Sequence, residues 1–123
     1  MKRVRILVID DEASVTRGIS LNLEALGSYE VRQENDPRNA IATARAFMPD
    51  LILLDVMMPH IDGSDLAREL RADPLLKRVP VIFLTALLTT RETKGHEVRV
   101  AGWNYLAKPV DLAELTRAIE SHL

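Results

Sequence analysis

The chain has 123 residues, of which 47% are hydrophobic, and this size and composition predict one compact domain with its own core. Its 16 basic and 18 acidic residues give a formal net charge of −2, which argues against direct nucleic-acid binding. The absence of cysteine excludes disulfides, thiolate metal sites and a cysteine nucleophile, and it is compatible with the reducing cytoplasm. The apolar run at the start is too short for a signal peptide or a membrane span, so we expect a cytoplasmic protein without membrane attachment.

The sequence alternates between strand-like and helix-like segments. Runs of consecutive large apolar residues predict strands that are buried on both faces, as in a parallel sheet. The expected strands are 5–9, 29–32, 51–54, 81–84 and 103–107. Apolar residues at helical spacing, followed by Gly or Pro, predict helices between the strands. The expected helices are 14–26, 36–47, 62–71, 89–101 and a last one from 111 onward.

Two of these helices differ in the strength of their signals. The helix at 14–26 has a clear buried stripe, formed by Val15, Ile19, Leu23 and Leu26. The segment 89–101 contains Gly95 and several β-branched residues, and Gly costs about 1 kcal/mol relative to Ala in a helix interior. We therefore expect 89–101 to be a weak helix and the most mobile one.

This alternation predicts an α/β domain, with a doubly wound five-stranded parallel sheet and helices on both faces. No hairpin turn signal interrupts it. Ligands of such sheets bind outside the carboxyl ends of the strands. Five polar residues follow or end the expected strands, so the fold would bring them into one cleft. They are Asp10, Asp11, Asp55, Thr85 and Lys108.

These side chains suggest a metal-dependent reaction. Three converging carboxylates would repel one another and raise each other's pKa values, so a divalent cation is expected among them. Ligands that are all oxygen suit a hard cation, and a site with few carboxylates and several waters suits Mg²⁺ better than Ca²⁺. Thr85 and Lys108 would supply donors to an anion. Together these groups favour phosphoryl transfer to a nucleophilic carboxylate.

At this point the sequence resembles the response-regulator receiver domain, the phosphoacceptor module of two-component and phosphorelay signalling. The resemblance covers essentially residues 1–123. It implies the flavodoxin-like strand order 2-1-3-4-5. The motifs that carry it are Leu7-Val8-Ile9-Asp10-Asp11-Glu12, Leu53-Leu54-Asp55 followed by Met58-Pro59 and Asp62-Gly63, Leu84-Thr85-Ala86, and Tyr105-Leu106-Ala107-Lys108-Pro109.

The resemblance implies specific roles for the acidic residues. Asp55 would accept a phosphoryl group from a phosphohistidine of a sensor histidine kinase or a phosphotransfer protein. Asp11, Asp55 and the main-chain carbonyl of Met57 would bind Mg²⁺ directly, and Asp10 would act mostly through water. The protein would then be a regulatory phosphoacceptor that catalyses its own phosphorylation and dephosphorylation, not an enzyme with a separate substrate.

The same resemblance implies a switch. Thr85 and Lys108 would hold phosphoryl oxygens, Thr85 would move toward the new phosphate, and Tyr105 would turn inward behind it. The surface formed by the fourth helix, the fifth strand and the fifth helix would then change. The Lys108–Pro109 bond is implied to be cis. Thr85 and Tyr105 also fit an ordinary packing role in strands, and that alternative stays open.

Three positions depart from the family. Met57 and Leu87 are apolar where polar side chains can orient an attacking water, so we hypothesise slow dephosphorylation. The segment from Ala101 to Tyr105 is one residue shorter than usual, and Trp103 replaces a small residue. Trp103 would be either a core residue that fills the gap or an exposed anchor for a partner.

Other functions fit less well. A phosphatase with an aspartyl-phosphate intermediate would need an acid two residues after Asp55, where Met57 stands. The glycines form neither GxxxxGK nor GxGxxG, which disfavours nucleotide binding. A receiver fold that binds a partner without phosphorylation is the remaining alternative. No effector domain is present in the sequence, so the output would pass to a downstream protein partner or to a missing effector domain.

Overall fold

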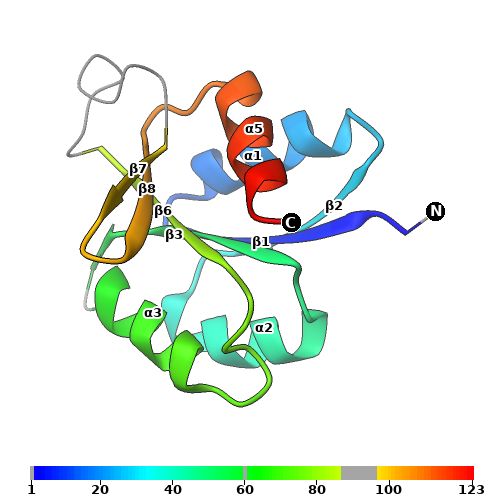
Figure 1. Cartoon of the computed structure of the whole chain (residues 1–123). Helices are drawn as coiled ribbons and strands as arrows, with labels where there is room; N and C mark the ends of the chain where they lie inside the picture. Colours follow the sequence, from blue (N-terminus) through cyan, green and yellow to red (C-terminus); the bar gives the residue numbers. More distant parts are fainter. Residues whose placement is uncertain (1, 60, 87–96) are drawn as a thin grey trace.

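The computed structural model describes residues 2–59, 61–86 and 97–123 and shows a central sheet covered by helices on both faces (Figure 1). In chain order the elements are β1 (Val4–Ile9), α1 (Ala13–Glu24), β2 (Tyr29–Glu34), the short 3₁₀ helix η1 (Pro37–Asn39), α2 (Ala40–Phe47), β3 (Leu51–Asp55), β4 (Met57–Met58), β5 (Ile61–Asp62), α3 (Gly63–Ala72), β6 (Val81–Thr85), β7 (Val98–Val100), β8 (Trp103–Ala107) and α5 (Leu112–Ser121).

The main sheet has the order β2-β1-β3-β6-β8-β7. The first five of these strands are parallel, and their order confirms the predicted 2-1-3-4-5 topology. The sixth strand, β7, was not predicted. It pairs antiparallel with β8 at the edge of the sheet. The strands β4 and β5 form a separate two-stranded hairpin after β3.

The sheet separates two apolar cores. Successive side chains of a strand point to opposite faces, so each apolar strand serves both layers. Leu7 and Ile9 of β1 pack toward α2 and α3, whereas Ile6 and Val8 pack toward α1 and α5. All four side chains are completely buried. This double burial is why the strands are continuous apolar runs without alternation.

The predicted helix at 89–101 is wrong at its carboxyl end, where Val98–Val100 is the strand β7. The residues Ala101 and Gly102 have φ values of 53° and 85° and connect β7 to β8. Two successive positive φ values are typical of a tight hairpin turn, so the expectation that no hairpin interrupts the alternation is wrong here. β-Branched Val98 and Val100 favour a strand. Residues 87–96, including Leu87 and most of the expected helix, lie outside the described residues.

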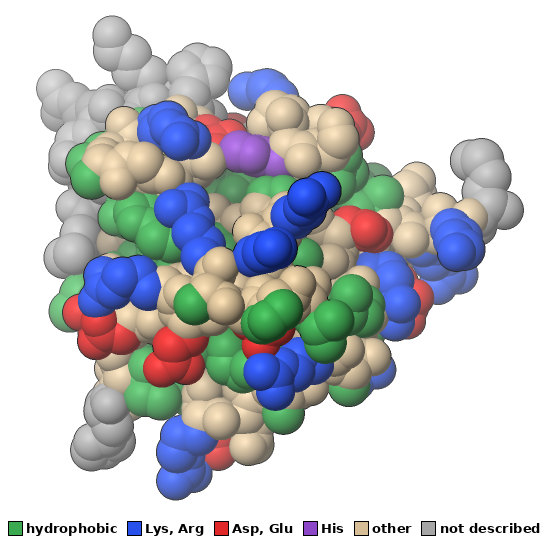
Figure 2. Space-filling view, turned by 60° about the horizontal axis from the view of Figure 1, so that its bottom comes forward, with side chains coloured by type: hydrophobic (Ala, Val, Ile, Leu, Met, Phe, Trp, Pro, Cys, Tyr) green, Lys and Arg blue, Asp and Glu red, His purple; other side chains and the backbone are tan. Residues whose placement is uncertain are grey.

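The first helix is also shorter than predicted. It ends at Glu24 instead of residue 26, and Gly27 has a φ of 83°. Leu26 is 49% exposed, so it is not part of the buried stripe that it was expected to complete. None of the helices in the described part of the chain is long and apolar enough to cross a membrane. Figure 2 shows basic and acidic side chains interspersed on the face in view, in line with the balanced charge of the sequence.

Candidate functional site

Four neighbouring parallel strands bring the predicted site residues together at the carboxyl ends of the strands. Asp10 follows β1, Asp55 ends β3, Thr85 ends β6 and Lys108 follows β8. The strands β6 and β8 are in register, with Thr85 opposite Ala107, and the Lys108 N–H donates to the Thr85 carbonyl at 2.8 Å. The expectation that these segments meet at the carboxyl ends of the strands is confirmed.

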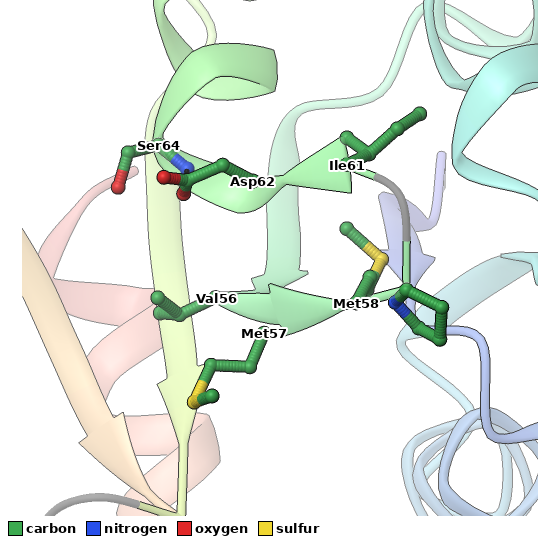
Figure 3. Close-up of a pocket in the computed structure, with 7 residues that line it drawn as sticks. Val56, Met57, Met58, Ile61, Asp62 and Ser64 are labelled. Carbon is green, nitrogen blue, oxygen red and sulfur yellow. Dashed lines mark hydrogen bonds between the residues drawn. The ribbon is translucent and has the colours of Figure 1, made fainter.

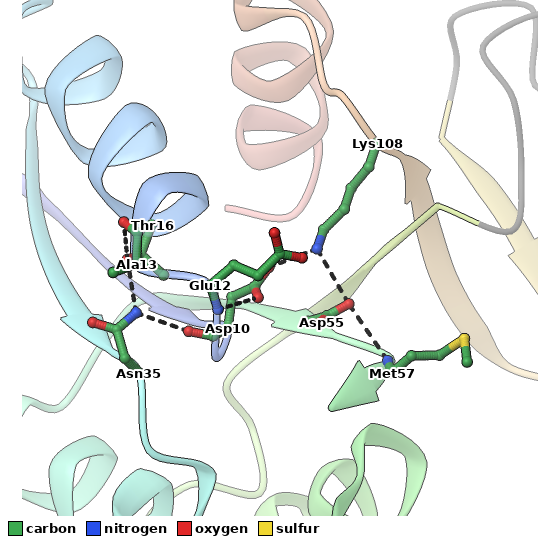
Figure 4. A network of polar contacts seen from close by, with 8 residues as sticks. All are labelled: Asp10, Glu12, Ala13, Thr16, Asn35, Asp55, Met57 and Lys108. Atoms are coloured by element: carbon green, nitrogen blue, oxygen red, sulfur yellow. Dashed lines mark hydrogen bonds and ion pairs between the residues drawn. The ribbon is translucent and has the colours of Figure 1, made fainter. Parts of the chain in front are cut away.

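Lys108 connects two of the carboxylates. Its Nζ lies 2.6 Å from Asp10 Oδ2 and 3.3 Å from Asp55 Oδ1 (Figure 4). Asp10 has no exposed surface, and Asp55 is 5% exposed. A buried carboxylate is costly unless it is paired and hydrogen-bonded, and Lys108 provides that pairing for both. Asp10 Oδ1 also accepts a hydrogen bond from the Glu12 N–H at 3.0 Å.

The acidic residues form a cluster that fits a divalent cation. One oxygen from each of Asp10, Asp11 and Asp55 lies within 4.8 Å of the other two. Asp11 is exposed, whereas the other two are buried, so solvent reaches the cluster from the side of Asp11. Carboxylates with water access are the ligands that Mg²⁺ prefers. The donor set therefore fits the predicted metal, and the ligand role of the Met57 carbonyl remains a prediction.

Burial and neighbouring charges shift the pKa values of two groups in the site. Burial, and then the negative charge of Asp10, raise the pKa of Asp55 above its ordinary value, although Lys108 and the Met57 N–H oppose this shift. Burial alone would lower the pKa of Lys108, but the hydrogen bond and charge of Asp10 and the charge of Asp55 raise it. Lys108 therefore carries its charge at neutral pH. A cation at the cluster would likewise favour the ionised form of Asp55.

The segment after Asp55 is held tightly against the end of β3. The Gly63 N–H donates to the Val56 carbonyl at 2.9 Å, and a Cβ at Gly63 would lie 2.4 Å from the Asp55 carbonyl oxygen. Only glycine fits such a close approach without movement of the backbone. Asp62 then caps α3 by accepting from the Ser64 N–H at 2.8 Å. These contacts fix the position of Asp55 relative to α3.

A shallow pocket lies beside this segment, and its lining is mostly apolar (Figure 3). Met57 and Met58 project to opposite sides of the β4–β5 hairpin. Met58 is 8% exposed and belongs to the core, whereas Met57 is 64% exposed. The Met57 N–H donates to Asp55 Oδ1 at 3.4 Å, so the backbone of this exposed residue lies next to the Asp55 carboxylate, and its side chain extends away from that carboxylate (Figure 4).

Thr85 and Tyr105, the predicted switch residues, lie on neighbouring strands. Thr85 is 3% exposed at the end of β6. Tyr105 is half-buried, and its ring stacks on Phe83 at 5.1 Å between centroids. Trp103 packs on the same Phe83 at 5.3 Å. Both aromatic side chains of β8 therefore rest on one core residue.

Trp103 is also covered from outside. The Arg71 guanidinium carbon lies 3.4 Å from the centre of its ring, and an Arg71 nitrogen donates to the Gly102 carbonyl at 3.2 Å. Trp103 is half-buried, which favours the packing role over that of an exposed anchor. The Lys108–Pro109 bond is cis, as the resemblance implied.

Sequence reasoning missed two polar residues next to the cluster. Asn35 Nδ2 donates to the Asp10 carbonyl at 2.8 Å and to Thr16 Oγ1 at 2.9 Å. Asn35 directly follows β2, and its position in register with Asp10 is the signal that could have identified it. Thr16 lies on the buried side of α1 and has no exposed surface.

The chain matches the family model for the response regulator receiver domain over residues 6–120. It is 37% identical over 119 residues to the DNA-binding dual master transcriptional regulator RpaA of Synechocystis sp., covering 97% of this chain and 48% of that protein. It is 38% identical over 117 residues to the response regulator PleD of Caulobacter vibrioides, covering 95% of this chain and 25% of that protein. The chain thus spans half or less of the length of these curated relatives.

Solved structures of similar length share the fold. The chemotaxis protein CheY4 of Vibrio cholerae superposes with a TM-score of 0.82 at 28% identity, covering 98% of this chain and 99% of that chain. A response regulator from Chloroflexus aurantiacus superposes with a TM-score of 0.81 at 32% identity, covering 98% of both chains.

Proposed function

The chain belongs to the response regulator receiver domain family of two-component signalling, and from this premise we propose that residues 1–123 form one receiver domain in which Asp55 is the phosphoacceptor. The observation that carries this proposal is the position of Asp55. It is buried at the end of β3, where Lys108 forms an ion pair with it. The carboxylates of Asp10 and Asp11 lie in the same cluster. A receiver is a regulatory phosphoacceptor, and Asp55 is the carboxylate on which these groups converge.

The proposed reaction transfers a phosphoryl group from a phosphohistidine of a kinase or phosphotransfer partner. An Asp55 carboxylate oxygen forms the new O–P bond, the N–P bond breaks, and the departing imidazole keeps the electron pair of that bond. Asp55 must be ionised to attack. Burial raises its pKa and so disfavours the ionised form, whereas the positive charge of Lys108 favours it. Lys108 then moves its hydrogen bonds from carboxylate to phosphoryl oxygens. The Thr85 hydroxyl would donate to another phosphoryl oxygen.

Asp10, Asp11, Asp55 and the Met57 carbonyl would hold Mg²⁺, which supplies charge neutralisation for the phosphoryl oxygens. The aspartyl phosphate would be long-lived, because the thioether of exposed Met57, two residues after Asp55, is only a weak hydrogen-bond acceptor and would orient an attacking water poorly. The signal would leave through β8 and α5, with Tyr105 turning inward. It would reach a downstream protein or an effector region of a longer chain.

The test is phosphorylation by a small acyl phosphate in the presence of Mg²⁺, followed by intact mass spectrometry. We expect a gain of one phosphoryl group in the wild type and none in Asp55→Asn. Asp65→Asn is the matched control, because Asp65 is an exposed carboxylate that pairs only with Arg68 among the described residues. An equal gain in Asp55→Asn, or no gain in the wild type, would contradict the proposal. The second result would favour an interaction module that is not phosphorylated.

A further inference from the structure

The ladder between β1 and β2 ends in a side-chain hydrogen bond at Asp10. The two strands pair in register up to Ile9 and Glu34, so Asn35 stands opposite Asp10. The Asp10 N–H still donates to the Glu34 carbonyl at 3.1 Å. A regular parallel ladder would then bring the Asp36 N–H to the Asp10 carbonyl. That N–H donates instead to Glu34 Oε2 at 3.0 Å, and Asn35 Nδ2 takes its place at 2.8 Å.

The same amide also holds the first helix. Asn35 Nδ2 donates to Thr16 Oγ1 at 2.9 Å, and this hydroxyl has two acceptors for its own proton, Ala13 O at 3.1 Å and Gln33 Oε1 at 3.0 Å. Figure 4 shows the Asn35 amide between the end of β1 and α1. Since the Asp10 carbonyl can only accept, the amide nitrogen must face it. One side chain therefore ties the start of the loop 10–12 to the first turn of α1.

This loop carries two of the three clustered carboxylates. The Asp10 carboxylate has its own partners, Lys108 and the Glu12 N–H. The Asp11 carboxylate has no hydrogen-bond or ion-pair partner among the residues that the structure describes. Its position is therefore set by the main chain of the loop, which Asn35 fixes at Asp10. Partners that orient the ligands of a metal contribute about 10–100-fold to its affinity.

We propose that Asn35 is a positioning residue for the Mg²⁺ site of this chain, with Thr16 as its support on α1. The inference rests on the proposed function. Asn35 holds the Asp10 carbonyl, and through it the Asp11 carboxylate, in the geometry that the cation requires. Asn35 touches neither the cation nor the phosphoryl group, so its loss changes the concentration of Mg²⁺ that the reaction needs but not the rate at saturating Mg²⁺.

The test is calorimetric titration with Mg²⁺, together with the rate of phosphorylation by acyl phosphate over a range of Mg²⁺ concentrations. For Asn35→Ala we expect the Kd for Mg²⁺ to rise by about tenfold, and the rate at saturating Mg²⁺ to remain near that of the wild type. Asn39→Ala is the matched control, since Asn39 is exposed and makes no side-chain hydrogen bond in the described part of the chain. Its Kd should match that of the wild type.

A second pair of variants keeps the test valid if Asn35→Ala does not fold. Thr16→Val removes the hydroxyl and should weaken Mg²⁺ binding. Thr16→Ser keeps the hydroxyl and should bind Mg²⁺ with a Kd close to that of the wild type. An unchanged Kd in Asn35→Ala, or in Thr16→Val, would overturn the inference, as would a rate deficit that persists at saturating Mg²⁺. Mg²⁺ binding and phosphorylation of the wild type would in that case leave the proposed function standing. A wild type that binds no Mg²⁺ would contradict both.

Discussion

Lys108 Nζ lies between two carboxylates, 2.6 Å from Asp10 and 3.3 Å from Asp55. The ammonium is thus a cation already inside the acidic cluster. Before phosphorylation it offsets the repulsion between two buried acids, which would otherwise be among the costliest groups in the domain. A divalent cation at the cluster would oppose Lys108 electrostatically while it attracts the same carboxylates.

The first prediction concerns the removal of this ammonium. Lys108→Met should lower the free energy of unfolding by about 3 kcal/mol without Mg²⁺, because buried Asp10 loses its charged partner. The same variant should bind Mg²⁺ more tightly than the wild type, because a competing positive charge is gone, and Mg²⁺ should restore part of its stability. Urea unfolding with and without Mg²⁺ measures both effects. Lys77→Met, at an exposed lysine, should change neither; a loss of Mg²⁺ affinity in Lys108→Met would contradict the prediction.

The second prediction is a pH dependence at Asp55. Burial and the charge of Asp10 raise its pKa in the folded protein above the ordinary value of 3.8. Ionisation of Asp55 therefore lowers the free energy of unfolding. This cost is fully present above the pKa of the folded state and absent below the pKa of the unfolded state. Without Mg²⁺, Asp55→Asn should raise the Tm by a few degrees at about pH 7.5, and this gain should shrink as the pH falls toward about 4. The difference in Tm between the wild type and Asp55→Asn removes the pH dependence that the other acidic residues contribute to both proteins. A gain that is the same at both pH values would be inconsistent with a raised pKa.

Much of the fold follows from continuous apolar runs. The strands β3 and β6 could be predicted without knowledge of their neighbours, because strands buried on both faces are continuous apolar runs. The convergence of Asp55 and Lys108 then follows from the parallel order alone. In contrast, β7 has only three residues, and its identity depends on pairing with β8 through a turn at Ala101 and Gly102. Such pairing is set by tertiary context, which local patterns do not contain.

The contacts of Asn35 show the same limit within the site. An Asn after a strand is usually a turn residue, and nothing local distinguishes it from Asn39. Only the register of β1 and β2 places its amide at the Asp10 carbonyl. Trp103 is a similar case, since its packing depends on Arg71 of α3, which is distant in sequence.

The third prediction concerns the close approach at Gly63. A Cβ there would lie 2.4 Å from the Asp55 carbonyl oxygen and 2.8 Å from Val56 Cα, so Gly63→Ala requires the backbone to shift. We expect a loss of about 3 kcal/mol in unfolding free energy and slower phosphorylation, because Asp55 moves with its carbonyl. The control is Gly18→Ala within α1, where a Cβ meets nothing within 4 Å. That variant should gain about 0.5–1 kcal/mol. Equal stabilities of the two variants would rule out the tight contact.

The fourth prediction tests the packing of Trp103 under Arg71. Arg71→Ala removes the guanidinium from the ring and the hydrogen bond to the Gly102 carbonyl. Acrylamide should quench Trp103 fluorescence more strongly in this variant, and stability should fall by about 1 kcal/mol. Arg68→Ala removes an exposed arginine one turn earlier on α3, where it pairs with Asp65, and should leave the quenching unchanged. Strong quenching already in the wild type would show that Trp103 is an exposed anchor.

The last prediction concerns the lifetime of the proposed aspartyl phosphate. Met57 is 64% exposed, and its backbone nitrogen lies 3.4 Å from Asp55 Oδ1, so we expect a polar side chain at this position to reach a water that approaches the phosphoryl group. Met57→Asn introduces an amide that can hydrogen-bond such a water, and it should accelerate dephosphorylation by about tenfold. Met57→Leu stays apolar and should keep the lifetime of the wild type. The decay of the phosphorylated mass species over time, after removal of the acyl phosphate, gives the three rates. Equal decay in all three proteins would mean that water reaches the phosphoryl group along a path that avoids Met57.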